Sequence, residues 1–180
     1  KGVKEFLEQC FPEIVREVPE ACFVIVGENP MESLIHHADV MGELKVLVGD
    51  MRLENHVRLL GWLSDEDLAK VYRASDLMVL PVLPMKDDVE GFGIVLLEAA
   101  AAGLPAVATR VGGISDAIED GKSGILIDPE DCESMSRAIV NLLRDDRGRV
   151  TLGEYARKRV REEFSWERVV KKYDEMLASL

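Results

Sequence analysis

The chain has 180 residues, of which 47% are hydrophobic, and a formal net charge of −12 at pH 7. This length and apolar content suffice for one domain with its own hydrophobic core. The excess of negative charge disfavours nucleic acid and an anionic membrane surface as main partners, because both would repel the chain.

Other features of the sequence bear on where the domain works. No apolar run is long enough to cross a bilayer and no signal peptide opens the chain, so we expect a cytoplasmic protein without a membrane span. Peripheral membrane association of a longer protein stays open. Cys10, Cys22 and Cys132 lack the spacing of a metal site, and we expect them to be buried or incidental thiols in a reducing compartment.

The amino-terminal segment has the pattern of an amphipathic helix, with Val3, Phe6, Leu7 and Phe11 on one face. Pro12 should kink or split this helix, because a proline in a helix interior removes a hydrogen bond and clashes with the preceding turn.

Strands and helices then alternate along the chain. The apolar run 22–27 predicts a fully buried parallel strand, and residues 32 to about 49 predict a helix that carries His36 and His37 toward solvent. Further strands are predicted at 55–61, 76–81, 106–109 and 124–128. Further helices are predicted after the N-cap Ser64, at 94–102, from 110–114 to about 119, from about 129 to 144, from a break at 145–148 to 163, and after the N-cap Ser165. This alternation predicts an α/β fold of three layers, with a Rossmann-like, doubly wound parallel sheet and a ligand at the carboxyl ends of its strands.

The stretch Glu90-Gly-Phe-Gly-Ile-Val-Leu-Leu-Glu98 places a Gly-Phe-Gly turn before a helix, with a carboxylate on either side. Unpaired N–H groups at a helix N-terminus attract anions, and Gly91 and Gly93 have no Cβ to keep a phosphate from the backbone. The flanking carboxylates suit sugar hydroxyls better than phosphate. The residues alone also allow a second interpretation, in which Glu90 only complements the helix dipole.

This stretch resembles the Glu-x7-Glu motif of a large family of retaining glycosyltransferases that includes glycogen synthases, sucrose synthases and bacterial mannosyltransferases. The similarity extends to Ala74-Ser-Asp-Leu, Leu80-Pro, Ala106-Val-Ala-Thr-Arg-Val-Gly-Gly, Asp120-Gly-Lys-Ser-Gly and Asp128-Pro. It covers nearly the whole chain as the carboxy-terminal half of a GT-B fold. We therefore expect residues 1–180 to form a single donor-binding domain, truncated at its start, with residues 165–180 as a closing helix.

The resemblance implies that the domain binds a nucleoside diphosphate sugar. Glu98 would bind the ribose, and Glu90 would be the catalytic residue that orients the hexose by its hydroxyls without acting as a nucleophile. The diphosphate would lie on the turn and the start of the helix, which are Gly91, Phe92, Gly93, Ile94 and Val95.

Two positions outside the motif complete the expected site. Lys1 lies in a Lys-Gly pair that resembles the family's phosphate-binding lysine, although by residue type alone it is a flexible terminal cation. Leu63 would face the nucleotide base, and the neighbouring Trp62 either stacks on the base or packs beside a strand end.

The reaction implied by the resemblance is transfer of a hexosyl group to an acceptor with retention at the anomeric carbon. Backbone N–H groups and Lys1 would neutralise charge on the diphosphate leaving group, so we expect no metal or other cofactor, and Asp87-Asp88 is unsupported as a cation site. An amino-terminal acceptor domain, absent here, would be the partner, and the isolated fragment should be inactive. Two alternatives are another GT-B enzyme, such as a sugar-nucleotide epimerase, and a non-catalytic sugar-nucleotide-binding module.

Overall fold

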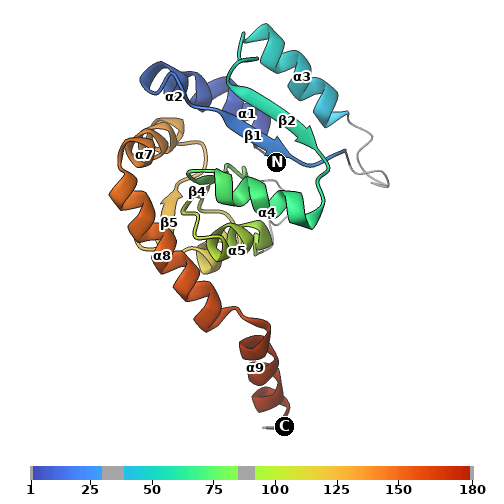
Figure 1. Ribbon diagram of the computed structural model, residues 1–180, viewed down its shortest axis with the longest axis vertical. Helices are drawn as coiled ribbons and strands as arrows, with labels where there is room; N and C mark the ends of the chain where they lie inside the picture. The colour runs from blue at the N-terminus through green and yellow to red at the C-terminus, as the bar shows by residue number, and fades with distance from the viewer. Residues whose placement is uncertain (1, 30–38, 85–91, 179–180) are drawn as a thin grey trace.

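The computed structural model describes residues 2–29, 39–84 and 92–178, and Figure 1 gives their arrangement. Its strands are β1 (Phe23–Val26), β2 (Val57–Gly61), β3 (Met78–Leu80), β4 (Ala106–Thr109) and β5 (Gly124–Ile127). Its helices are α1 (Val3–Glu5), the π-helix η1 (Phe6–Cys10), α2 (Phe11–Glu17), α3 (Val40–Asp50), α4 (Asp65–Ala74), α5 (Ile94–Ala101), α6 (Ile114–Ala117), α7 (Cys132–Arg144), α8 (Asp146–Glu163) and α9 (Trp166–Ala178).

The strand ladders of these segments are parallel. β1 pairs with β2, and β4 lies between β3 and β5, with Val107 opposite Val79 on one side and Ile125 on the other. Parallel neighbours need crossover connections, and helices supply them here. The predicted parallel α/β fold is confirmed.

Strand β4 shows how helices cover both faces of its sheet. All four of its residues are buried. Val107 belongs to a core cluster formed with η1, α2, α3 and α7, whereas Ala106 and Ala108 belong to a second cluster formed with α5 and α6. Because successive strand residues point to opposite faces, each cluster fills one side of the sheet.

The prediction of a fully buried first strand is wrong. The residues of β1 are all half-buried, in contrast to those of β4. Within the described residues β1 has a ladder partner along one edge only, whereas β4 is flanked on both edges. Burial of a strand depends on its neighbours as well as on its own side chains.

The disturbance predicted at Pro12 takes the form of a π-helical turn. The N–H of Phe11 donates to the carbonyl of Phe6, five residues back, and Pro12 then lies in the first turn of α2, where a missing N–H is tolerated. The helical segment therefore continues, and it buries Phe6, Leu7 and Ile14 on one face.

Several helix bounds differ from the prediction. The helix α3 lies within the predicted range, and His36 and His37 fall outside the described residues. The helix α6 ends earlier than predicted, at Ala117. Only Asp145 separates α7 from α8, instead of the predicted break over 145–148. Asp145 is the N-cap of α8, because its carboxylate accepts the Gly148 N–H at 2.9 Å.

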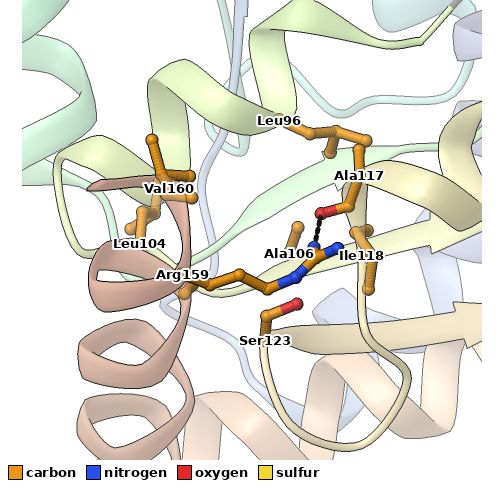
Figure 2. Close-up of a pocket in the computed structure, with 10 residues that line it drawn as sticks. Leu96, Leu104, Ala106, Ala117, Ile118, Ser123, Arg159 and Val160 are labelled. Atoms are coloured by element: carbon orange, nitrogen blue, oxygen red, sulfur yellow. Dashed lines mark hydrogen bonds between the residues drawn. The ribbon is translucent and has the colours of Figure 1, made fainter. Parts of the chain in front are cut away.

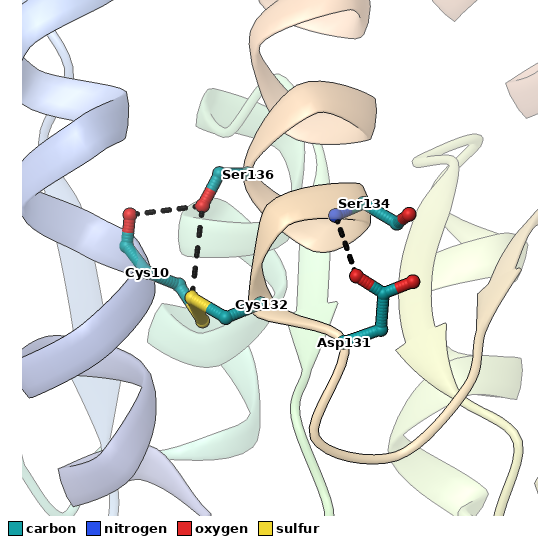
Figure 3. Close-up of a disulfide and its surroundings, with 5 residues drawn as sticks. All are labelled: Cys10, Asp131, Cys132, Ser134 and Ser136. Carbon is teal, nitrogen blue, oxygen red and sulfur yellow. Dashed lines mark hydrogen bonds between the residues drawn. A yellow bond between two sulfur atoms is a disulfide. The ribbon is translucent and has the colours of Figure 1, made fainter.

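A disulfide joins Cys10 of η1 to Cys132 of α7, as Figure 3 shows. The two Cα atoms lie 5.2 Å apart although the residues are separated by 122 positions. Beside the bridge, the hydroxyl of Ser136 donates to the carbonyl of Cys10 at 3.0 Å. The prediction of free thiols is thus wrong for these two cysteines, while Cys22 is free and exposed.

The chain ends in two helices of different environment. The helix α8 packs along α5, where the Cβ of any larger residue at Gly153 would lie 2.0 Å from the Gly103 carbonyl oxygen. The helix α9 follows the predicted N-cap Ser165 and extends away from the sheets (Figure 1). In the described part of the chain, no helix is both long and apolar enough to cross a membrane.

Candidate functional site

The helix α5 begins at the carboxyl end of β3, because its N-cap Gly93 lies beside Leu80, the last residue of that strand. Its N-cap is Gly93, with φ 71° and ψ 58°, and no side chain among the described residues caps it. Ile94 and Val95, which carry the first helical N–H groups, are 68% and 38% exposed. This end of α5 therefore offers backbone N–H groups and the positive end of the helix dipole to an anion.

Packing fixes the position of this turn. A Cβ at Gly93 would lie 3.1 Å from Leu96 Cδ1 and 3.6 Å from Leu80 Cδ2, and its positive φ strains other residues. At the other end of α5, Gly103 has φ 83° and the Leu104 N–H donates to the Ala99 carbonyl. Together with the Gly103 N–H, which donates to the Ala100 carbonyl, this forms a Schellman ending just after the predicted helix 94–102.

Phe92 lies against the far end of α8 rather than open to solvent. Its ring contacts that of Phe164, and the guanidinium of Arg159 lies 4.9 Å from the Phe164 ring centroid. Arg159 in turn donates to the carbonyl of Ala117 at the end of α6, as Figure 2 shows. The expected contact of Phe92 with the donor can therefore come from its backbone, because its side chain is used for packing.

Glu98 lies one turn into α5 and is exposed. The hydroxyl of Tyr72, in the last turn of α4, donates to Glu98 Oε2 at 3.0 Å. Burial, and then the hydrogen bond with Glu98, raises the pKa of Tyr72. The periodicity of the helix after Ser64 does not identify Glu98 as the partner of Tyr72, because the two residues are 26 positions apart.

Leu63 lies immediately before the capped start of α4. The Ser64 hydroxyl accepts the Asp67 N–H at 3.2 Å, as predicted from this pair. Leu63 is half-buried, whereas Trp62 is 70% exposed. So large an exposed fraction does not fit the alternative in which Trp62 packs beside the strand end.

Three expected site residues, Lys1, Glu90 and Gly91, lie outside the described residues. The residue after Lys1 is placed, however. Gly2 has φ 77°, and a Cβ there would lie 1.7 Å from the carbonyl oxygen of Pro81, directly after β3. Gly2 therefore lies at the carboxyl end of β3, from which the chain leads toward α5.

Two other segments that carry the resemblance meet through an ion pair. Arg110 Nη2 lies 2.9 Å from Asp120 Oδ2, and Asp120 Oδ1 accepts the Leu126 N–H at 2.9 Å. These contacts connect the loop after β4, through Asp120, to the backbone of β5, so the charged side chains of this pair support the fold.

Neither of two hollows fits a sugar nucleotide by itself. The cavity between α5, α6 and α8 measures about 10 Å³, close to the size of a single water (Figure 2). A pocket of about 300 Å³ lies at the carboxyl ends of β3, β4 and β5, but four acidic residues, Glu5, Asp128, Glu130 and Asp131, are among those that line it, and their charge would repel a diphosphate. Among the described residues, no group of three acidic, histidine or cysteine side chains is placed to hold a metal.

Comparison with known proteins places this geometry in a family. The model of the family described as Glycosyl transferases group 1 matches residues 1–145. The chain is 37% identical over 137 residues to the D-inositol 3-phosphate glycosyltransferase of Corynebacterium urealyticum, covering 76% of this chain and 31% of that protein. It is 35% identical over 166 residues to the N-acetyl-alpha-D-glucosaminyl L-malate synthase of Bacillus anthracis, covering 92% of this chain and 39% of that protein.

A solved structure agrees with this relationship. Anabaena HepE, solved in complex with UDP, matches with a TM-score of 0.80 and 25% identity over 96% of this chain and 45% of its own. The chain thus spans less than half the length of each of these three proteins. The chain belongs to the group 1 family of glycosyl transferases, and its fold is that of the carboxy-terminal half of a GT-B enzyme.

Proposed function

We propose that this chain is the donor-binding domain of an enzyme that transfers a hexosyl group from a nucleoside diphosphate sugar, with retention, to an acceptor held by an amino-terminal domain. The observation that carries the proposal is the uncapped N-terminus of α5 at the carboxyl edge of the sheet, with Glu98 one turn further along the helix. The named activities of the relatives are transfers or syntheses, which favours transfer over an epimerase or a binding module.

In this proposal each part of the donor has its own protein contacts. The backbone of Gly93, Ile94 and Val95, with Gly91 and Phe92 before them, holds the diphosphate, and Lys1 adds a positive charge. Glu98 accepts hydrogen bonds from the ribose hydroxyls, and Leu63 faces the base. Glu90 orients the hexose.

The chemistry follows from where charge develops. Departure of the nucleoside diphosphate leaves negative charge on phosphate oxygens, and fixed N–H donors with a nearby cation stabilise that charge. The helix dipole adds to this effect without any reorganisation during the reaction. We therefore propose a reaction that needs no metal ion, and the exposed N-terminus of α5 supports this assignment.

Calorimetry with UDP, GDP and ADP tests the donor site on the 180-residue chain. One of the three should bind, and Glu98→Ala should weaken it by about 10-fold or more, because the ribose loses charge-assisted hydrogen bonds. Glu154→Ala, at an exposed position on α8, is the matched control and should change nothing. Equal binding by Glu98→Ala and the parent chain would refute the ribose contact.

A further inference from the structure

Tyr72 and Glu98 come from different helices and meet through one hydrogen bond. The Tyr72 hydroxyl lies 3.0 Å from Glu98 Oε2, with Tyr72 half-buried and Glu98 exposed. An ionised carboxylate only accepts hydrogen bonds, so Tyr72 must be the donor. Tyr72 is partly buried, whereas the exposed carboxylate by itself would be free to change rotamer.

This hydrogen bond leaves Glu98 able to bind a second partner. Two carboxylate oxygens offer about four acceptor positions, and Tyr72 uses one of them on Oε2. The remaining acceptor positions of the carboxylate are enough to accept hydrogen bonds from two neighbouring hydroxyl groups. A carboxylate already held in one orientation loses less conformational entropy when it binds them.

The placement of Tyr72 in α4 connects two parts of the site. The helix begins at Asp65, directly after Leu63 and the cap Ser64, and Tyr72 lies in its last turn. One helix therefore carries the segment expected at the base and the side chain that contacts Glu98. A tyrosine phenol is protonated at neutral pH and can donate, and burial raises the pKa of Tyr72 further.

We propose that Tyr72 is a positioning residue that holds the Glu98 carboxylate in the orientation that receives the two ribose hydroxyls of the donor. This inference rests on the proposed function, because it assumes that Glu98 binds ribose. It implies that Tyr72, a residue outside the Glu-x7-Glu stretch, contributes to recognition of the ribose.

The test measures binding of UDP, GDP and ADP, and of the 2′,3′-dideoxy form of the one that binds, by calorimetry. Tyr72→Phe keeps the ring and removes the donor, and it should weaken the ribonucleotide by about 3- to 10-fold. It should leave the dideoxy form unchanged. In the Glu98→Ala background, adding Tyr72→Phe should cause no further loss.

Tyr155→Phe is the matched control. Tyr155 also donates its hydroxyl to a carboxylate, at 2.6 Å to Glu119 Oε2, but this hydrogen bond joins α8 to the segment after α6 and includes no residue of α4 or α5. This variant should bind the ribonucleotide like the parent chain.

The possible failures are distinguishable. If Glu98→Ala weakens binding and Tyr72→Phe does not, the positioning role is wrong and the proposed function stands. If Tyr72→Phe weakens the ribonucleotide and its dideoxy form equally, Tyr72 acts only on the fold and the inference is overturned. If Glu98→Ala has no effect, or none of the three nucleotides binds, the donor site and the inference fail together.

Discussion

The ring of Phe92 packs against the ring of Phe164, with 5.3 Å between their centroids and an interplanar angle of 53°. Phe92 belongs to the turn before α5, and Phe164 directly follows α8. Arg159 of α8 lies over the Phe164 ring and donates to the Ala117 and Asp116 carbonyls. The end of α8 therefore supports the turn on which the proposed diphosphate site is built.

This contact predicts measurable coupling between the two rings. Phe92→Leu and Phe164→Leu, combined in a double-mutant cycle by urea unfolding, should show an interaction free energy of about 0.5–1.5 kcal/mol, because aromatic pairs contribute that much beyond buried area. Phe92→Leu combined with Phe11→Leu is the control. Phe11 lies in the other core cluster, so those two effects should add within about 0.5 kcal/mol. Additive effects of the 92/164 pair would contradict a stabilising contact.

A second prediction concerns the backbone of Gly93. Gly93→Ala should lower the free energy of unfolding by about 1–2 kcal/mol, because φ is 71° and the new Cβ would press on Leu96. We also expect weaker nucleoside diphosphate binding, since the turn must shift. Gly49→Ala, in α3 with no atom within 4 Å of the new Cβ, should instead raise the free energy of unfolding by about 0.5–1 kcal/mol. Urea unfolding and calorimetry measure both effects; no loss of stability in Gly93→Ala would show that the turn adopts another conformation.

Sequence patterns predicted those parts of the fold that depend on near neighbours. The alternation of strands and helices, the cap at Ser64 and the end of α5 at Gly103 were all found in the structure. Each rests on residues within a few positions of one another, where periodicity and turn chemistry act directly. The start of α5 at Gly93 follows from the same local chemistry.

Contacts between distant residues could not be predicted in this way. The Tyr72–Glu98 hydrogen bond, the Phe92–Phe164 contact and the approach of Gly2 to Pro81 depend on how helices and strands pack. The expectation of thiols at Cys10 and Cys132 rests on their lack of metal-site spacing, and their positions in the sequence do not show that the fold brings them together. The half-buried state of β1 likewise depends on which strands flank it, and an apolar run does not reveal this.

The disulfide leads to a third prediction. Without reductant, the denatured chain should contain one reactive thiol, that of Cys22, and reduction should raise the number to three. Reduction should also lower the free energy of unfolding by up to roughly 4–5 kcal/mol, because a bridge over 122 positions strongly restricts the unfolded chain. Cys22→Ser should keep this sensitivity to reductant, and Cys10→Ser/Cys132→Ser should lose it. Three reactive thiols without reductant would show that the bridge does not form.

The cap of α7 gives a prediction about pH. The carboxylate of Asp131 accepts the Ser134 N–H at 2.9 Å, and this hydrogen bond holds the pKa of Asp131 below its usual 3.8. A lowered folded-state pKa means that the ionised cap stabilises the fold above about pH 4. That contribution is lost as the pH falls through the folded-state value.

Asp131→Asn isolates this effect, because asparagine still caps a helix but does not titrate in this range. The melting temperature of the parent chain minus that of Asp131→Asn should be larger at pH 6 than at pH 3. Thermal unfolding of both proteins at intervals between these values measures the difference, and the other acids cancel because both chains carry them. A difference that stays constant with pH would mean that ionisation of Asp131 does not stabilise α7.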